Sequence, residues 1–375
     1  MIRDVWQALK NYYVSPRRPL AAYLNLTERC NLRCIFCELG KNADFSLSEE
    51  LSFDEVCRIL NELKNWKVKK IFLGGGEPLI RQGIWSIFEY AASKKIAIWQ
   101  VLTNGFILDG LTKEQKSILK RVVSILNISL DSASPELHDR LRGVPGTFAR
   151  IKRFLELSAN GGLPRVYITS IVARDNYAEI PRLTRFLGAY NIGHIGFQPI
   201  NFFSNYPNRR PLHDKEKFLL NGGEDADRLL EAIADGIRIS RELGISTNLE
   251  LLKLFIAEYF LYAGTDEYFF DKVMNNFICS NVFNYLYIDS RGDLLACSLL
   301  PKLDNIAGKD LKDVWRRNAF NLRKWSRQKK FYPECRSCFC GFAANFSHCL
   351  IYHPIANFSL MRELAPYYLG RHCIQ

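Results

Sequence analysis

The chain lacks a long uninterrupted run of apolar residues. Its longest apolar stretch, over residues 251–264, contains Lys253 and Glu258 and is shorter than the roughly 20 residues that cross a bilayer. The N-terminus carries charge at Arg3 and Asp4, where an export signal needs an apolar segment, and no small-residue cleavage site follows. Because both features are missing, we expect a cytoplasmic protein without a transmembrane segment.

Internal repeats, low-complexity tracts and flexible linkers are also absent from the sequence. Hydrophobic residues make up 48% of the 375 residues and charged residues 24%, which argues against a disordered or fibrous chain. A chain of this length buries a sizeable core and accommodates one large α/β domain with an appended domain. The formal net charge of +12 favours anionic ligands, but it is spread along the sequence.

The eleven cysteines are many for a chain that is expected in a reducing compartment, where disulfides are rare. Metal or cluster ligation is therefore the leading explanation for cysteines that lie close together in the sequence. Cys57 stands alone in a helical pattern and is expected to be a buried small hydrophobic residue. The other ten form three groups, which are Cys30, Cys34 and Cys37; Cys279 and Cys297; and Cys335, Cys338, Cys340, Cys349 and Cys373.

Strand-length apolar runs alternate with helical patterns over residues 20–200. Six β-α units in series predict a parallel sheet with right-handed crossovers, either doubly wound or rolled into a full or partial barrel. In such folds ligands bind at the carboxyl ends of the strands. The expected strands are 20–26, 70–73, 96–102, 123–130, 166–172 and 194–200, and the helices between them are 52–66, 84–94, 113–120, 148–160 and 180–190.

The alternation stops after Ile200, and a polar loop leads into helical patterns at 223–243 and 251–263. From residue 277 the pattern becomes a hairpin, with expected strands at 282–288 and 294–297, followed by a helix and a cysteine-rich tail. The expected divisions are an N-terminal helical extension at 1–19, an α/β domain at 20–200, a helical connection at 201–276, a cysteine-rich domain at 277–349 and a tail at 350–375.

The first three cysteines follow the first expected strand directly, in the segment CNLRCIFC at 30–37. This position places three thiolates at the carboxyl end of a strand, where ligands bind. Soft thiolates select iron–sulfur clusters, zinc or Cu(I). A fourth ligand is absent nearby, and a structural site normally closes its coordination shell. The open position therefore indicates a centre that binds a substrate or a cofactor.

The Cys-x3-Cys-x2-Cys spacing, with the aromatic Phe36 before the last cysteine, resembles the signature of the radical S-adenosylmethionine (SAM) superfamily. The resemblance implies a partial (β/α)6 barrel, a [4Fe–4S] cluster on Cys30, Cys34 and Cys37, and SAM at the open iron. It also implies a 5′-deoxyadenosyl radical that abstracts hydrogen from a substrate, with an external electron donor such as flavodoxin or ferredoxin. A three-cysteine zinc site with a remote fourth ligand is the alternative.

Polar or glycine-rich segments also end the next expected strands, at 74–78, 103–105 and 129–131. The first of them resembles the Gly-Gly-Glu-Pro motif that holds the methionine amino group of SAM in this superfamily. Asp131 is expected either at this rim or as a helix cap, and Asn176 and Gln198 either line the pocket or form a local turn or a core hydrogen bond. The cofactor-binding residues that the resemblance implies are Phe36, Gly75, Gly76, Glu77, Pro78, Ser129, Arg142, Asn176 and Gln198. The sequence identifies no catalytic acid or base.

Four C-terminal cysteines resemble the pattern of Twitch and SPASM domains, which hold auxiliary [4Fe–4S] clusters. Cys279 and Cys297 bracket the hairpin, Gly292 stands five positions before Cys297, and Cys335 and Cys338 follow a helix. The resemblance implies that these four thiolates bind one auxiliary cluster and that the domain consists of a β-hairpin and a helix.

The last cysteines depart from the full SPASM spacing, because Cys340 follows Cys338 after one residue. One auxiliary cluster and two are therefore both open, with Cys340, Cys349 and Cys373 as ligands of the second. A zinc knuckle of Cys335, Cys338, Cys340 and either His348 or Cys349 is the alternative for this tail.

These resemblances predict an oxidoreductase whose auxiliary cluster accepts the electron of the substrate radical or ligates the substrate. A small polar metabolite, a sugar or an amino sugar, is the leading substrate. A ribosomally made peptide that is oxidised or cross-linked is the alternative, although residues 1–19 leave no room for a separate peptide-recognition domain. The rival from another class is a zinc-stabilised nucleic-acid-binding protein, which requires a basic, aromatic-rich face. We expect no DNA partner.

Overall fold

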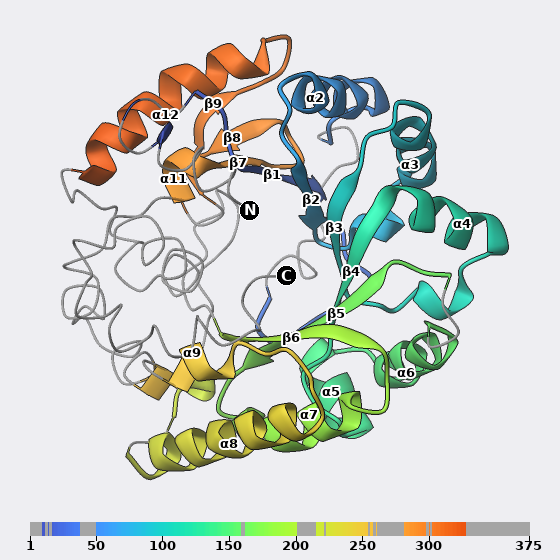
Figure 1. Cartoon of the computed structure of the whole chain (residues 1–375), viewed down its shortest axis with the longest axis vertical. Coiled ribbons are helices and arrows are strands. Elements are labelled where there is room, and N and C mark those ends of the chain that lie inside the picture. The colour runs from blue at the N-terminus through green and yellow to red at the C-terminus, as the bar shows by residue number, and fades with distance from the viewer. Residues whose placement is uncertain are drawn as a thin grey trace.

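The structure is a computed structural model in which a curved sheet carries helices on its convex side (Figure 1). The strand order is β6-β5-β4-β3-β2-β1-β7-β8-β9. Every pairing from β6 to β7 is parallel, and the pairings of β8 with β7 and β9 are antiparallel. The structure describes residues 10–11, 14, 17–37, 50–158, 162–200, 215–220, 223–253, 256–257, 260, 281–297, 300 and 302–327.

All six predicted parallel strands are present, with bounds within two residues of those expected. Buried residues alternate along them, as Ala22, Leu24 and Leu26 do in the first strand, and this face packs against the helices. The predicted partial barrel is thereby confirmed. The strands are β1 (Ala21–Thr27), β2 (Lys70–Gly75), β3 (Ile98–Thr103), β4 (Val123–Ser129), β5 (Arg165–Val172) and β6 (Ile192–Pro199).

The crossover helices follow the predicted pattern, and the capping box of Ser52 and Glu55 is formed at the start of the first of them. None of the helices in the described ranges is long and apolar enough to cross a membrane. The helices are α2 (Phe53–Asn65), α3 (Ile84–Ser93), α4 (Lys113–Val122), α5 (Pro135–Arg142), α6 (Thr147–Ser158), α7 (Ile180–Leu187), α8 (Gly223–Glu242) and α9 (Leu249–Lys253). Short 3-10 segments lie at Pro78–Ile80, Leu108–Gly110, Tyr177–Glu179 and Lys215–Phe218.

Helix α5 is an element that apolar periodicity does not predict. Ser134 caps its N-terminus, and its side chain accepts a hydrogen bond from the Leu137 N–H. Its buried residues are His138, Leu141 and Arg142, so two of the three side chains on its inner face are polar. A helix that buries polar groups for a site produces no apolar stripe in the sequence.

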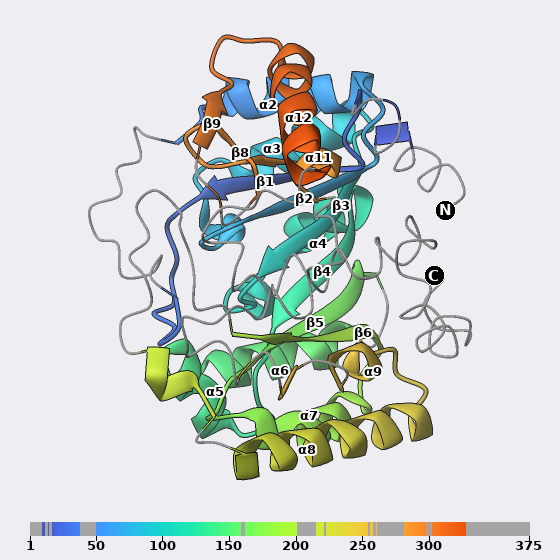
Figure 2. The same ribbon diagram turned by 90° about the vertical axis from the view of Figure 1, so that its left-hand side faces the viewer.

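The C-terminal region continues the same sheet. Strand β7 (Tyr285–Ile288) pairs in parallel with β1, so that Ala21 lies opposite Tyr285 and Leu24 opposite Ile288. The predicted hairpin is formed by β7 and β8 (Asp293–Leu295), but its first strand is shorter than expected because α11 (Asn281–Asn284) precedes it. A further strand, β9 (Lys302–Asn305), and helix α12 (Leu311–Arg327) complete this region (Figure 2).

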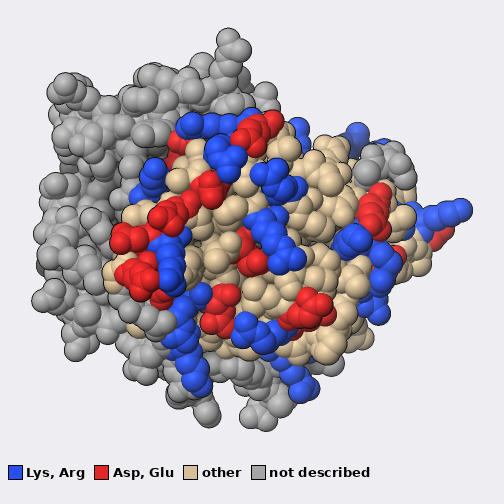
Figure 3. All heavy atoms as spheres, turned by 90° about the horizontal axis from the view of Figure 1, so that it is seen from below, with Lys and Arg blue, Asp and Glu red and all other residues tan. Residues whose placement is uncertain are grey.

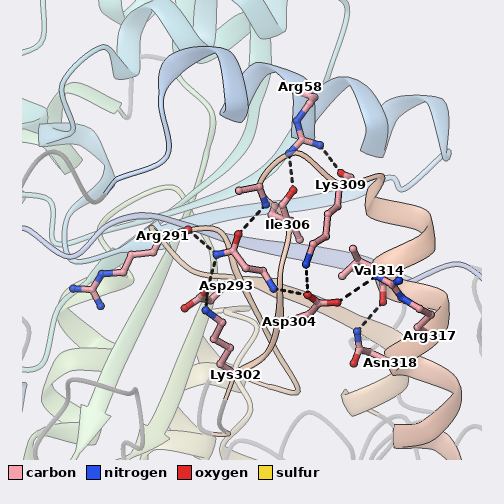
Figure 4. A network of polar contacts seen from close by, with 12 residues as sticks. Arg58, Arg291, Asp293, Lys302, Asp304, Ile306, Lys309, Val314, Arg317 and Asn318 are labelled. Atoms are coloured by element: carbon pink, nitrogen blue, oxygen red, sulfur yellow. Dashed lines mark hydrogen bonds and ion pairs between the residues drawn. The ribbon is translucent and has the colours of Figure 1, made fainter.

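Side chains on both faces of the sheet join the two regions. On one face the Tyr23 ring stacks between Phe72 and Tyr287, with centroid distances of 4.3 and 4.8 Å. On the other side the Arg58 guanidinium of α2 donates to the carbonyls of Ile306 and Lys309, both at 3.0 Å (Figure 4). The C-terminal region therefore packs directly onto the first β-α unit.

Acidic and basic side chains alternate over the face of the molecule at its α7–α8 end (Figure 3). On α8 the Arg238 guanidinium pairs with Asp235 at 3.1 Å and with Glu242 at 2.9 Å. Arg228 pairs with Glu224 on the same helix. This face therefore differs from the continuous basic surface that a nucleic-acid-binding protein requires.

Candidate functional site

Three cysteines lie on the loop that leaves the carboxyl end of β1. Cys34 is buried, whereas Cys30 and Cys37 are partly exposed. The Cys37 N–H donates to the Cys34 carbonyl at 3.1 Å, which forms a tight turn. The three sulfurs lie close enough for Cys34 to interact electrostatically with both of the others. The loop therefore presents three thiols at the predicted ligand-binding edge of the sheet.

The glycine-rich end of β2 packs against one side of this loop. The Gly76 N–H donates to the Thr27 carbonyl at 2.7 Å, and the Glu77 N–H donates to the Arg29 carbonyl at 2.8 Å. A Cβ atom on Gly75 would lie 2.2 Å from the Thr27 oxygen, and one on Gly76 would lie 2.1 Å from the Arg29 oxygen. Only glycine permits this approach, so the glycines place the β2 end directly beside the cysteines.

The C-terminal end of α5 holds the other side of the loop. The Arg33 N–H donates to the Arg142 carbonyl at 3.1 Å, and the Ile35 N–H donates to the Leu141 carbonyl at 3.0 Å. Gly143, with φ of +71°, ends the helix, and a Cβ there would lie 2.1 Å from the Arg33 oxygen. The cysteine loop is therefore held between β2 and a helix that the apolar pattern did not predict.

The Glu77 carboxyl group is fully buried and links β2 to β3. It accepts hydrogen bonds from the Leu79 N–H at 3.0 Å, the Thr103 hydroxyl at 2.9 Å and the Asn104 N–H at 2.6 Å. Burial raises its pKa to about 7, although these three donors oppose that shift. Glu77 thus organises the rim, and its predicted contact with SAM stays a prediction.

Asn104 is a residue that the resemblance did not assign to the site. Its side-chain NH2 group lies 2.7 Å from the Asn31 Oδ1 and 3.5 Å from the Cys30 sulfur. The Leu32 N–H also points to the Cys30 sulfur, at 3.4 Å. The signal in the sequence was the polar segment 103–105 at the end of the third strand.

Arg142 and Asp131 form a buried ion pair beside Cys34. The Arg142 Nη2 donates a hydrogen bond to Asp131 Oδ1 at 2.8 Å. The Arg142 Nε lies 2.6 Å from Asp131 Oδ2, but these two atoms form an ion pair and not an aligned hydrogen bond. The Arg142 Nη1 lies 3.8 Å from the Cys34 sulfur, and the guanidinium carbon is 5.3 Å from the centroid of the Phe36 ring. Ser134, and not Asp131, is the N-cap residue of α5. Of the two positions expected for Asp131, the one at the rim beside the cysteine loop is therefore the one observed.

The other predicted residues lie at the same edge of the sheet. Asn176 is buried and forms core hydrogen bonds, donating to the carbonyls of Asp131 at 2.9 Å and Ile171 at 2.6 Å. Ser129 and Gln198 are half-buried next to fully buried neighbours on their strands, so they point to the sheet face away from the helices. Pro78 is buried and begins the 3-10 turn after β2.

The three thiols are suited to a [4Fe–4S] cluster, in which each thiolate binds its own iron. Burial raises the pKa of the Cys30 thiol to about 11 and also raises that of Cys34, while Arg142 opposes the shift at Cys34.

Cys297 is the auxiliary cysteine that the structure describes; it follows β8 and packs against the hydrophobic core. The turn before β8 lies beside the two ends of the segment between β1 and α2: the Leu51 N–H donates to the Ser290 carbonyl at 2.7 Å, and Arg291 lies 3.9 Å from Glu28. The remaining candidates lie outside the described residues, namely Cys279, Cys335, Cys338, Cys340, His348, Cys349 and Cys373.

Two family models match the sequence. The model of the radical SAM superfamily matches residues 24–187, and that of an iron–sulfur cluster-binding domain named SPASM matches residues 279–339. The first match contains the three loop cysteines, and the second contains Cys279, Cys297, Cys335 and Cys338.

Curated relatives of this chain differ in their reactions. It is 27% identical over 229 residues to a probable GTP 3′,8-cyclase of Methanosarcina acetivorans, a match that covers 60% of this chain and 64% of the cyclase. It is 25% identical over 329 residues to an AdoMet-dependent heme synthase of Methanosarcina barkeri, a match that covers 84% of this chain and 86% of the synthase. It is 30% identical over 175 residues to the mycofactocin maturase of Mycolicibacterium smegmatis, a match that covers 46% of this chain and 42% of the maturase.

Solved structures share the fold. Streptococcus suis SuiB bound to S-adenosylmethionine has a TM-score of 0.59 at 21% identity, covering 86% of this chain and 72% of SuiB. SuiB bound to its precursor peptide SuiA has a TM-score of 0.57 at 23% identity, and the match covers 84% of this chain and 68% of SuiB. The protein anSMEcpe with bound AdoMet has a TM-score of 0.59 at 16% identity, and the match covers 86% of this chain and 87% of anSMEcpe.

Proposed function

Since the chain belongs to the radical SAM superfamily and carries a SPASM iron–sulfur cluster-binding domain, we propose that it cleaves SAM reductively at a [4Fe–4S] cluster held by Cys30, Cys34 and Cys37. When bound, the cluster and SAM supply a 5′-deoxyadenosyl radical from one electron and the sulfonium. The observation that carries the proposal is the cysteine loop at the carboxyl end of β1, hydrogen-bonded to both β2 and α5. A flavodoxin or ferredoxin is the proposed electron donor.

The proposed task of the surrounding residues is to orient SAM and to exclude water. The peptide backbone at Gly75 and Gly76 lies against the Thr27 and Arg29 carbonyls at the start of the cysteine loop, where it would border bound SAM. The Ser129 hydroxyl projects from the end of β4 on the face away from the helices, which suits a hydrogen bond to a polar part of SAM. Gln198 takes the same position on β6.

For the substrate, the relatives favour a peptide over a sugar. The mycofactocin maturase, at 30% identity, supports the peptide, and SuiB has been solved with its precursor peptide. None of the relatives named above supports the sugar or amino sugar that the sequence favoured. We therefore propose hydrogen abstraction from a residue of a ribosomally made peptide, with an auxiliary cluster on Cys279, Cys297, Cys335 and Cys338 receiving the substrate electron. The heme synthase match, which covers 84% of this chain, makes a tetrapyrrole the second candidate.

Release of 5′-deoxyadenosine tests the cofactor chemistry. Anaerobically purified protein with reductant and SAM should release 5′-deoxyadenosine, and Cys34→Ala should abolish the release. Cys57→Ala is the matched control, because Cys57 is a buried cysteine of α2 away from the loop and should leave the release intact. Release that persists in Cys34→Ala, or a protein that holds zinc without sulfide, would refute the proposal.

Deuterium transfer tests the substrate class. The substrates to test are precursor peptides that are encoded beside the gene and labelled with deuterium. We expect the label to move to 5′-deoxyadenosine and the peptide to lose hydrogen, and mass spectrometry detects both changes. Transfer from a labelled iron porphyrin and none from the peptides would instead support the tetrapyrrole candidate.

A further inference from the structure

A buried guanidinium contacts one of the three predicted cluster ligands. Arg142 stands in the last turn of α5, its side chain is 8% exposed, and its Nη1 lies 3.8 Å from the Cys34 sulfur. The sequence resemblance implies that Arg142 is a cofactor-binding residue, and that role stays a prediction. In the structure its guanidinium contacts Asp131, Cys34 and the Phe36 ring. Its position therefore suggests an effect on the cluster itself.

The thiols of Cys30 and Cys34 have different electrostatic surroundings. The Cys30 sulfur lies near two neutral donors, the Leu32 N–H and the Asn104 amide, and it also interacts with the Glu77 carboxyl group. The Cys34 sulfur faces the Arg142 guanidinium in a buried site, where Coulomb interactions are screened much less than in water. Charge and hydrogen bonds at the sulfurs set the reduction potential of iron–sulfur clusters. A cation at Cys34 therefore stabilises a more negative, reduced cluster.

Asp131 holds the guanidinium in place and partly neutralises it. Its carboxylate is fully buried, contacts Arg142 through both oxygens, and accepts a hydrogen bond from the Ile171 N–H at 2.9 Å. The Asp131 N–H in turn points to the Nδ1 of buried His138 at 3.2 Å. The Phe36 ring also contacts the guanidinium, whose carbon lies 5.3 Å from the ring centroid.

We propose that Arg142 acts through Cys34 to raise the reduction potential of the [4Fe–4S] cluster, and that Asp131 limits this increase. The inference rests on the proposed function, because it requires the cluster on the cysteine loop. In the reduction step an external reductant loses one electron and the cluster–thiolate unit gains it, with no bond formed or broken. The guanidinium stabilises the extra negative charge, and the Asp131 carboxylate opposes it.

An EPR-monitored redox titration of the full-length, anaerobically reconstituted protein without SAM tests this proposal. The signal that is missing in Cys34→Ala identifies the relevant cluster. Arg142→Gln should lower the equilibrium constant for reduction about tenfold, or ~59 mV for a one-electron couple. Arg142→Lys keeps the charge and should stay near the wild-type potential. Asp131→Asn removes the opposing charge and should shift the potential in the other direction, to higher values.

Arg140→Gln is the matched control, because Arg140 belongs to the same helix but is 58% exposed and pairs with Asp175 at 2.9 Å. It should leave the potential unchanged. An unchanged potential in Arg142→Gln with full iron and sulfide content, or shifts of the same sign in Arg142→Gln and Asp131→Asn, would overturn the proposal. If Arg142→Gln loses its cluster, the test rests on Asp131→Asn, and a reduction potential that does not rise in that variant overturns the proposal. A wild-type protein that titrates as a [4Fe–4S] protein but releases no 5′-deoxyadenosine refutes the SAM chemistry and leaves this inference testable.

Discussion

The residues that shape the site most strongly are those that allow close backbone contact and those that bury charge. Gly76 and Gly143 each lie so close to a carbonyl oxygen of the cysteine loop that an added Cβ atom would be 2.1 Å from that oxygen. Glu77 and Asp131 are buried carboxyl groups that bind donors from neighbouring strands. Side chains of this kind cost stability unless they are satisfied, so their presence at one edge of the sheet marks the functional region.

Replacing either glycine by alanine should damage the cysteine loop. In Gly143→Ala and Gly76→Ala the new Cβ would lie 2.1 Å from a backbone oxygen, so the loop or α5 must shift, at a cost of about 1–3 kcal/mol. Both variants should bind less iron and sulfide per chain and unfold at lower denaturant concentration. Gly110→Ala, where a Cβ meets nothing within 4 Å, is the control and should match the wild type. Full cluster content in both variants would contradict this reasoning.

Glu77 should make folding stability depend on pH. Its pKa rises from 4.5 to about 7 on folding, so the folded chain keeps a proton that the unfolded chain has lost. The resulting stabilisation, on the order of 3 kcal/mol, is complete below pH 4.5 and is lost as the pH rises to 7. Denaturant titrations over this range should show a smaller decline in Glu77→Gln. Parallel curves for the two proteins would show that Glu77 does not titrate there.

Strand β7 is the element that connects the two sequence regions. Its four residues pair with β1, and the rings of Tyr287 and Tyr23 stack with an interplanar angle of 11°. The strand is short, and parallel pairing over so few residues depends on side-chain contacts for stability. The stacked rings therefore fix the C-terminal region beside the strand that carries the cysteine loop.

Loss of the central ring should loosen this connection. Tyr23→Leu removes two stacked contacts and should lower the free energy of unfolding by about 1–3 kcal/mol. Limited proteolysis should then cut the C-terminal region faster. Tyr285→Leu removes an edge contact with Tyr23 at 5.9 Å and should have a smaller effect. An equal effect of the two substitutions would show that stacking is not what joins the strands.

At the scale of the whole molecule, one hydrophobic core extends from the first strand to the last described helix. It includes Leu24 of β1, Leu286 of β7 and Trp315 of α12, and the Trp315 ring contacts Trp66 at the end of α2 edge-on, at 6.4 Å. The two family matches are thus separate in sequence but joined in structure. The turn at Ser290 and Arg291 contacts Leu51 and Glu28, which lie near the two ends of the segment between β1 and α2.

Iron and sulfide content should reveal how many clusters the molecule holds. With one auxiliary cluster the full-length protein should contain about eight irons per chain, and with two about twelve. Cys297→Ala should lose about four irons and retain the three-cysteine cluster, whose EPR signal should still respond to SAM. Cys34→Ala should show the opposite loss. An unchanged iron content in Cys297→Ala would remove Cys297 from the auxiliary ligands.

The sequence by itself determined the six parallel strands, the thiols at the end of the first strand and the glycine-rich turn beside them. These features are local, because strand length, residue spacing and the lack of a Cβ atom can each be predicted from a few neighbouring residues. Ser52 and Glu55 likewise formed the capping box that their spacing predicts.

Only the tertiary structure decided that α5 is a helix, that β7 extends the sheet beside β1, and that Arg142 meets Asp131 and Cys34. Each of these depends on groups far apart in the sequence, and the buried face of α5 is polar because it serves the site. Asn104, at a strand end, reaches Cys30 for the same reason. A chain encodes such contacts through the whole fold, so spacing along the sequence cannot reveal them.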